Sequence, residues 1–250
     1  MSKKKLDKSQ YIGITETGDP AFNLEIFERL YNANIIITKR LTNKLIEKLI
    51  ENKNKCILHC TVTGLGKSII EPLVPSKEDM FNKCKELIEK GFPIEQLVLR
   101  IDPIIPTEKG TQTAINVITL FKELNIKRIR ISFLDMYKHV KERFIKKNIP
   151  LPYSSFHSDI CIRMNIVNKL QKLGKEYGFV LEVCGEPGIN SVPCLSQRDI
   201  DILDLTNKII LVGNARQRKS CSCPMNKKEL IINGFNKKCG NECLYCYIKN

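Results

Sequence analysis

The chain has 250 residues, 42% of them hydrophobic and 27% charged, which is typical of a folded globular protein with a sizeable core. No apolar run reaches the length of a membrane span, and the N-terminal residues lack the apolar segment of a signal peptide, so we expect a cytoplasmic protein without a membrane partner. The formal net charge of +14 favours polyanions as partners, nucleic acid first, although the lysine richness of a low-GC genome gives the same excess.

Strand-like and helix-like segments alternate along the chain. The expected strands are Tyr11–Ile14, Asn34–Thr38, Cys56–Thr63, Gln96–Ile101, Arg128–Phe133, Phe179–Cys184 and, with a weaker pattern, Lys208–Val212. The expected helices are Ala21–Tyr31, Thr42–Glu51, Lys77–Lys90, Thr111–Leu124, Asp159–Tyr177 and Ser196–Leu205. This alternation predicts an α/β fold with a parallel sheet, and six to seven units predict a partial or complete (β/α) barrel of the TIM type.

Two segments depart from this rhythm. Lys138–Ser158 is long and basic, and we expect it to form a helix and a loop over the barrel mouth. Residues 206–250 contain five of the eleven cysteines. We therefore predict a barrel domain over residues 1–205 and a cysteine-rich, cluster-binding segment over 206–250 that packs on the barrel mouth.

Acidic side chains follow three of the expected strands. Asp102, Asp135 and Glu186 stand at the carboxyl ends of strands, where barrel enzymes keep their active sites, so these three are the candidate catalytic residues. For Asp102, which precedes Pro103, the alternative is a turn that stops the strand.

Three further residues are candidate cofactor contacts together with Asp102. Arg100 lies on the same strand face as Asp102 and could bind a carboxylate or a phosphate, or pair with a neighbouring acid. Thr63 and Gly64 follow the third expected strand, at the same edge of the sheet.

The strongest functional signal is the triad Cys239, Cys243 and Cys246, which has C-x-x-x-C-x-x-C spacing and the aromatic Tyr245 before its last cysteine. Three thiolates in one short loop can ligate three irons of a [4Fe–4S] cluster and leave the fourth iron open. Structural zinc is the alternative, but it favours paired C-x-x-C units and four ligands. The odd number of cysteines makes a disulfide framework a poor explanation.

Four more cysteines form a second candidate metal site: Cys184, Cys194, Cys221 and Cys223. Four thiolates suit a second iron–sulfur cluster or a zinc ion. The alternative is two small buried side chains and a surface turn. Cys56, Cys60, Cys84 and Cys161 lie in strand or helix patterns and are expected to fill the core.

Ordered short motifs along almost the whole chain carry a family resemblance. They include Gly18–Phe22, Glu71–Pro75, Arg100–Ile104, Ser132–Tyr137, Cys184–Glu186, Gln217-Arg218, Cys221–Cys223 and the tail from Cys239 to Tyr247. With these motifs the chain resembles a bacterial family of unassigned function whose members end in a radical-SAM-type cysteine triad. It departs from that family at Thr15–Thr17, where a basic pair is usual, and at Met225–Leu230. Arg100–Pro106 is also similar to a stretch of spore photoproduct lyase, a radical-SAM enzyme that acts on DNA.

The resemblance implies a circularly permuted radical-SAM barrel, because the cysteine loop comes last in the chain. It implies a [4Fe–4S] cluster, S-adenosylmethionine (SAM) at the open iron, a flavodoxin- or ferredoxin-type reductant, and a 5′-deoxyadenosyl radical as the reactive species. The expected substrate is DNA, RNA or a nucleotide. Two other classes stay open: a basic nucleic-acid-binding protein with structural zinc, and an iron–sulfur protein that only carries electrons. The sequence gives no oligomeric state.

Overall fold

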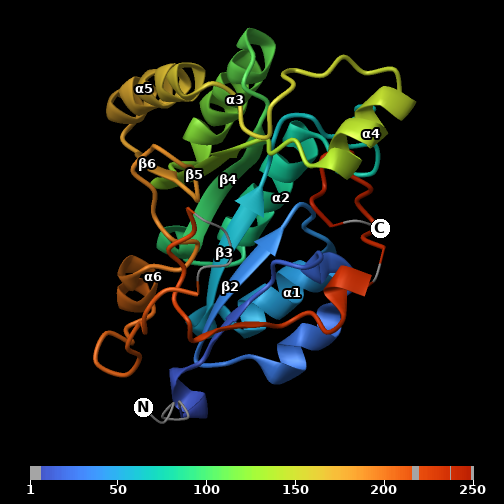
Figure 1. Cartoon of the computed structure of the whole chain (residues 1–250). Coiled ribbons are helices and arrows are strands. Elements are labelled where there is room, and N and C mark those ends of the chain that lie inside the picture. Colours follow the sequence, from blue (N-terminus) through green and yellow to red (C-terminus); the bar gives the residue numbers. More distant parts are fainter. Residues whose placement is uncertain (1–6, 216–219, 237, 249–250) are drawn as a thin grey trace.

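A seven-stranded parallel sheet forms the centre of the computed structural model, which describes residues 7–215, 220–236 and 238–248 (Figure 1). Its strands, in chain order, are β1 (Ile12–Ile14), β2 (Ala33–Thr38), β3 (Cys56–Thr61), β4 (Leu97–Ile104), β5 (Arg128–Phe133), β6 (Val180–Val183) and β7 (Lys227–Glu229). Their order in the sheet is β6-β5-β4-β3-β2-β1-β7.

The sheet is open, with β6 and β7 as its two edges in the described residues. The α/β class and the parallel sheet are therefore confirmed, and the architecture is compatible with a partial barrel. β7 pairs in parallel with β1, with Ile12 opposite Lys227, so the C-terminal part of the chain lies beside the first strand. A permuted chain has this arrangement.

The last expected strand is in the wrong place. Lys208–Val212 is irregular, and the seventh strand is Lys227–Glu229 instead. Side chains from other segments accept hydrogen bonds from backbone amides of residues 208–212. The amide of Ile210 donates to Gln10 Oε1 at 3.0 Å, and that of Val212 donates to Asn226 Oδ1 at 3.3 Å.

Six α-helices connect the strands: α1 (Asn43–Glu51), α2 (Lys77–Glu89), α3 (Glu108–Phe121), α4 (Lys138–Lys146), α5 (Ile160–Tyr177) and α6 (Gln197–Ile202). Short 3-10 helices occupy Lys8–Gln10, Pro20–Phe22, Leu24–Arg29, Lys53–Lys55, Ile94–Gln96, Lys122–Leu124 and Gly234–Asn236. Two of them replace the single helix expected over Ala21–Tyr31, because Asn23 between them has non-helical backbone angles. In the part of the chain that is described, no helix is both long and apolar enough to cross a membrane.

Two apolar layers cover the two faces of the sheet. One face packs against α1, α2, α3 and α5, and Ile36 and Leu58 of the sheet belong to the same buried cluster as Leu45 of α1. The other face carries Ile35 and Val98, which pack beneath Ile200 of α6 and the chain that follows (Figure 1). Each fully buried aliphatic side chain of this kind contributes about 1.5–3 kcal/mol.

Alternating residues of β5 carry charge to the second face. Arg128 and Arg130 lie almost wholly inside the protein. Arg128 Nη1 lies 2.8 Å from Asp199 Oδ1 at the start of α6. Arg130 donates from Nε to Glu182 Oε2 at 3.0 Å and from Nη1 to the Cys194 carbonyl at 2.7 Å. These contacts fix α6 and the loop after β6 against the sheet.

β4 continues beyond its expected end at Ile101. Asp102 and Pro103 lie inside the strand, at a shift in the β4–β5 register between Ile101 and Ile104. The interpretation of Asp102–Pro103 as a turn that ends the strand is therefore wrong.

Candidate metal and cofactor site

A cavity of about 580 Å³ lies at the carboxyl ends of the strands. Residues at or directly beyond the ends of all seven strands line it, among them Thr15, Thr38, Thr61, Asp102, Ser132, Cys184 and Glu229. In a parallel α/β sheet this edge is where ligands bind. The strands therefore place side chains from distant parts of the sequence around one space.

The three cysteines of the C-terminal triad all line this cavity. Cys239, Cys243 and Cys246 are half-buried, and two turns join them: the Glu242 amide donates to the Cys239 carbonyl at 3.4 Å, and the Cys246 amide donates to the Cys243 carbonyl at 3.1 Å. Glu242 has a φ of 49°, in the left-handed region, where the chain reverses. The sequence spacing therefore forms a compact loop with its thiols toward the cavity.

Contacts to α4 and to the loop after β3 hold the triad loop in place. Arg143 of α4 donates to the Cys246 carbonyl at 2.7 Å and to the Ile248 carbonyl at 2.9 Å. The Leu244 amide donates to the Ile70 carbonyl at 2.9 Å. The triad loop is thus fixed by contacts with residues more than a hundred positions away in the sequence.

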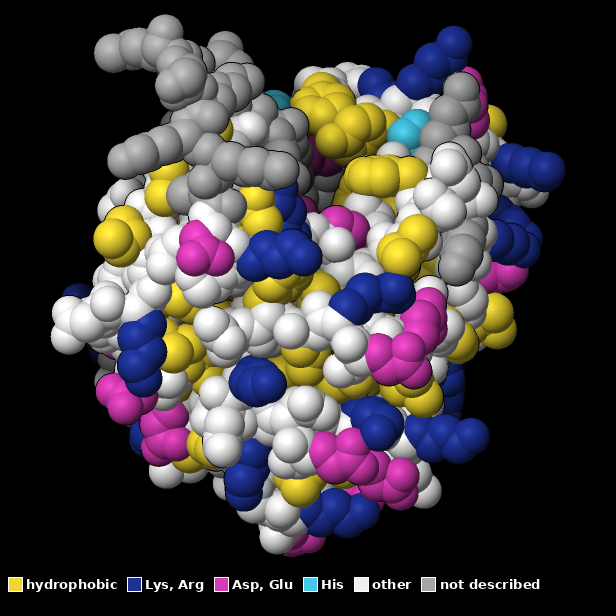
Figure 2. Space-filling model, turned by 90° about the horizontal axis from the view of Figure 1, so that it is seen from below, with side chains coloured by type: hydrophobic (Ala, Val, Ile, Leu, Met, Phe, Trp, Pro, Cys, Tyr) yellow, Lys and Arg dark blue, Asp and Glu magenta, His cyan; other side chains and the backbone are white. Residues whose placement is uncertain are grey.

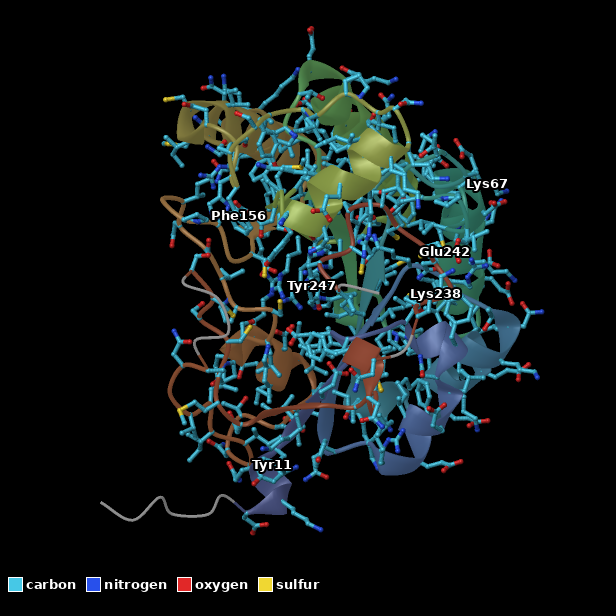
Figure 3. The ribbon with its side chains drawn as sticks, turned by 45° about the vertical axis from the view of Figure 1, so that its right-hand side comes forward. Tyr11, Lys67, Phe156, Lys238, Glu242 and Tyr247 are labelled. Atoms are coloured by element: carbon cyan, nitrogen blue, oxygen red, sulfur yellow. The ribbon has the colours of Figure 1, made fainter. Side chains whose placement is uncertain are left out.

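Three of the residues labelled in Figure 3 belong to this C-terminal segment. Tyr247 lies below α4, and its hydroxyl donates to the Glu16 carbonyl at 2.6 Å. Lys238 and Glu242 lie beside each other at the surface and form an ion pair (Figure 3). The triad cysteines line the cavity, while the charged side chains of Lys238 and Glu242 are exposed to water.

Asp19 connects the triad loop to the ends of β1 and β2. Its Oδ2 accepts from Asn241 Nδ2 at 2.7 Å and from the Lys39 amide at 2.9 Å. Its Oδ1 accepts from the Thr38 hydroxyl at 2.6 Å and from the Ala21 amide at 3.0 Å. Asn241 stands between the first two cysteines, so this buried carboxylate positions the loop directly.

A lysine lies beside the triad. Lys39 Nζ donates to the Tyr245 hydroxyl at 2.7 Å, to Glu71 Oε1 at 3.1 Å and to the Asp102 carbonyl at 3.2 Å. Burial alone would lower the pKa of Lys39, but Glu71, Cys243 and Asp102 raise it, so the ammonium stays charged. A fixed positive charge at this point favours anionic groups in the cavity.

Two of the triad thiols, those of Cys239 and Cys243, are protonated when no metal is bound. Burial raises the pKa of Cys243 to about 12 and also raises that of Cys239. The positive charge of Lys39 acts in the opposite direction on both. Metal binding therefore has to displace these protons, which couples metal affinity to pH.

The triad sulfurs do not all lie within 4.8 Å of one another. A tetrahedral zinc with Zn–S bonds of about 2.3 Å holds its sulfurs about 3.8 Å apart. The only group of three ligand atoms within 4.8 Å of one another that the described residues contain is Glu16, Cys194 and Cys223, and the triad is not one. In a [4Fe–4S] cluster each cysteine binds a different iron, so wider separations are needed.

The predicted acids differ in their surroundings. Asp102 lines the cavity, where Oδ2 accepts from Arg100 Nε at 2.8 Å and Oδ1 accepts from the Ser132 hydroxyl. Burial would raise the pKa of Asp102, yet Arg100 and Ser132 lower it, so the carboxylate is charged. Asp135 also lines the cavity, with Oδ1 at 2.9 Å from His157 Nδ1. Both carboxylates are thus held by partners and available to a ligand.

Three predicted residues are not among the described residues that line the cavity. Glu186 is buried, accepts from the Phe133 amide at 2.7 Å and pairs with Arg163 at 2.8 Å. Thr63 donates to Glu71 Oε2 at 2.5 Å. Gly64 has a φ of +77° and packs under α3. These contacts join each of the three residues to its neighbours in the fold.

The second group of cysteines converges from two loops. Cys184 Sγ lies 3.2 Å from Cys194 Sγ, and the Cys194 amide donates to Cys223 Sγ at 3.3 Å. Cys221, half-buried, forms a thiol hydrogen bond with Cys223. All four line the cavity, so the interpretation of Cys221–Cys223 as a plain surface turn is incomplete.

The network of Lys39, Glu71 and Tyr245 was not predicted from the sequence. Lys39 immediately follows β2, and Glu71 belongs to one of the motifs of the family resemblance, so both carried a signal. The pairing itself joins residues 32 positions apart, which no local pattern reveals.

These observations define a cysteine-rich α/β protein with an open parallel sheet and a thiol-lined cavity suited to a metal or iron–sulfur cofactor. The chain belongs to the family described as "Domain of unknown function (DUF1848)", whose model matches residues 28–248. This match confirms the expected membership of a domain family without an assigned reaction. Among curated proteins none matches the sequence. Gln217 and Arg218, which contribute to the resemblance, lie outside the described residues.

Proposed function

We propose that this protein is a radical-SAM-type enzyme whose [4Fe–4S] cluster is held by Cys239, Cys243 and Cys246. The observation that carries the proposal is that all three thiols line one cavity at the carboxyl edge of the sheet. The open sheet supports a permuted partial barrel, because its C-terminal strand pairs with β1. When bound, the cluster would supply the electron that cleaves SAM to methionine and a 5′-deoxyadenosyl radical.

The charged residues of the cavity can bind the polar groups of SAM. Lys39 offers a buried ammonium that would attract a carboxylate. Asp102 and Asp135 offer carboxylates that would accept hydrogen bonds from an ammonium or from ribose hydroxyls. Arg100, fixed by Asp102, would keep that carboxylate ionised.

The surroundings of the triad would exclude water. Leu244 and Tyr245, between the last two cysteines in sequence, are buried in one apolar cluster with Met136, which precedes α4, and Val140 of α4. A dry pocket strengthens electrostatic contacts and protects a reactive radical from solvent. Cys246 and its neighbours therefore occupy the side of the cavity that α4 covers.

For the substrate we propose a nucleic acid or a nucleotide, on the basis of the charge of +14. On the face drawn in Figure 2, lysine and arginine side chains lie among acidic ones. The exposed aromatic side chains of Phe235 and Tyr247 line the cavity and offer surfaces on which a base could stack. A salt-dependent affinity for DNA or RNA tests this part separately.

Anaerobic reconstitution with iron and sulfide, followed by reduction in the presence of SAM, tests the proposal. We expect methionine and 5′-deoxyadenosine in equal amounts from the wild-type protein and neither from Cys243→Ala. Cys161→Ala, which changes an exposed cysteine of α5, is the matched control and should behave as the wild type. An electron carrier would bind iron without forming these products.

A further inference from the structure

We propose that Cys184, Cys194, Cys221 and Cys223 bind one zinc ion that joins the two edge strands of the open sheet. The proposal does not rest on the radical-SAM assignment, because it uses none of the triad cysteines. Its basis is the position of the two cysteine-containing loops at the edges of the sheet.

The four cysteines stand at the two open edges. Cys184 directly follows β6, and its amide donates to the Ile131 carbonyl at 2.9 Å, which continues the sheet. Cys221 and Cys223 lie shortly before β7, the strand at the opposite edge. No backbone pairing joins β6 to β7 in the described sheet. Contacts between these thiols therefore connect two edge strands that no backbone pairing joins in the described sheet.

The distances gather the four thiols around Cys194. Cys194 Sγ lies 3.2 Å from Cys184 Sγ, closer than thiolates that bind different irons of a cubane, and Cys194 and Cys223 belong to a set of ligand atoms within 4.8 Å of one another. Cys184 and Cys221 are not in that set. A tetrahedral zinc holds its sulfurs about 3.8 Å apart, so Cys184, Cys221 and Cys223 would draw together around the ion.

Burial and charge also suit four thiolates. Cys184, Cys194 and Cys223 are each at most 5% exposed. A zinc ion with four thiolates carries two negative charges, which need neighbouring cations when buried. Arg100 Nη1 lies 3.6 Å from Cys194 Sγ, and Lys227 is buried beside the group.

Glu16 belongs to the surroundings of the ion rather than to its ligands. Its carboxylate is one of the three ligand atoms within 4.8 Å, but both its oxygens accept from Lys227 Nζ at 2.8 Å. Four cysteines already complete a tetrahedral site. Glu16→Gln should therefore keep the zinc.

Metal analysis of the full chain, purified in the presence of zinc, tests the proposal. We expect one zinc per chain in the wild-type protein and at least a tenfold loss of retained zinc in Cys194→Ser and Cys223→Ser after dialysis against a chelator. The matched control Cys161→Ser should retain it. The variant with all three triad cysteines changed to serine should also retain it, which separates this site from the proposed cluster.

Cobalt substitution of the wild-type protein gives a second readout if the cysteine variants do not fold. Co²⁺ should produce sulfur-to-cobalt charge-transfer bands and the intense visible bands of a tetrahedral site, and zinc should displace it. Three results would overturn the proposal: cobalt without these bands, zinc that persists in Cys223→Ser, or iron that occupies these four cysteines. A Cys184–Cys194 disulfide in the native protein, detected by mass spectrometry, would overturn it as well.

Discussion

The buried carboxylate of Asp19 gives the sharpest test of how the triad loop is held. It is 3% exposed and accepts four hydrogen bonds, from the Ala21 amide, the Thr38 hydroxyl, the Lys39 amide and Asn241 Nδ2. Asp19→Ala removes the acceptor for all four donors. Thr38 can still donate to the Arg40 carbonyl, 2.8 Å away, so three donors lose their partner.

The cost follows from these three donors. A buried donor left without a partner costs about 1–3 kcal/mol, which gives a range of about 3–9 kcal/mol. Water that fills the space of the lost carboxylate recovers part of this. We therefore expect Asp19→Ala to lower the free energy of unfolding by about 3–4 kcal/mol.

Urea unfolding followed by circular dichroism measures this loss. Glu25→Ala is the control, because Glu25 forms an exposed pair with Arg29 at 3.8 Å and should change stability by less than about 1 kcal/mol. If Asp19→Ala unfolds at the same urea concentration as Glu25→Ala, the reasoning about the Asp19 network is refuted.

Three further predictions concern other buried groups. Burial, with Arg130 and Arg100 nearby, lowers the pKa of His59 below 6.5. The neutral side chain therefore contributes its full stability above pH 6.5, and this stability is lost as the pH falls below that value. Urea midpoints measured across this range should depend less on pH in His59→Leu than in the wild type. Asp199→Ala removes the carboxylate closest to Arg128, whose side chain is 1% exposed, and should lower the free energy of unfolding in urea by about 3 kcal/mol. An unchanged urea midpoint would contradict the assigned ion pair. Arg143→Met removes two hydrogen bonds to the C-terminal segment. Iron should leave the reconstituted protein faster in a chelator assay, while the free energy of unfolding falls by no more than about 2 kcal/mol. An unchanged rate of iron loss would contradict the anchoring role.

Most strands could be predicted because a parallel sheet covered on both faces leaves continuous apolar runs in the sequence. β5, for example, has the predicted bounds Arg128–Phe133. β7 could not be found this way, since Lys227–Glu229 has no apolar run and exists through its pairing with β1. Lys208–Val212 has the composition of a strand, but side chains of Gln10 and Asn226 take its backbone donors.

The same distinction between local sequence patterns and long-range contacts applies to the candidate site. Residues near the carboxyl end of a strand, such as Asp102 and Asp135, could be predicted to face one cavity, because the topology brings strand ends together. Glu186 follows the same rule but turns to Arg163, a partner on α5 that the sequence does not reveal. Contacts between distant side chains, such as Lys39 with Glu71, need the folded chain.

The central claim, a cluster on the C-terminal cysteines that cleaves SAM, is tested most directly by iron counting and product analysis on one reconstituted sample. The account predicts about four irons per chain, bound through Cys239, Cys243 and Cys246, and reductive release of methionine with 5′-deoxyadenosine. Iron content that is the same after all three cysteines are changed to serine, or a fully loaded and reduced protein that leaves SAM intact, would contradict it.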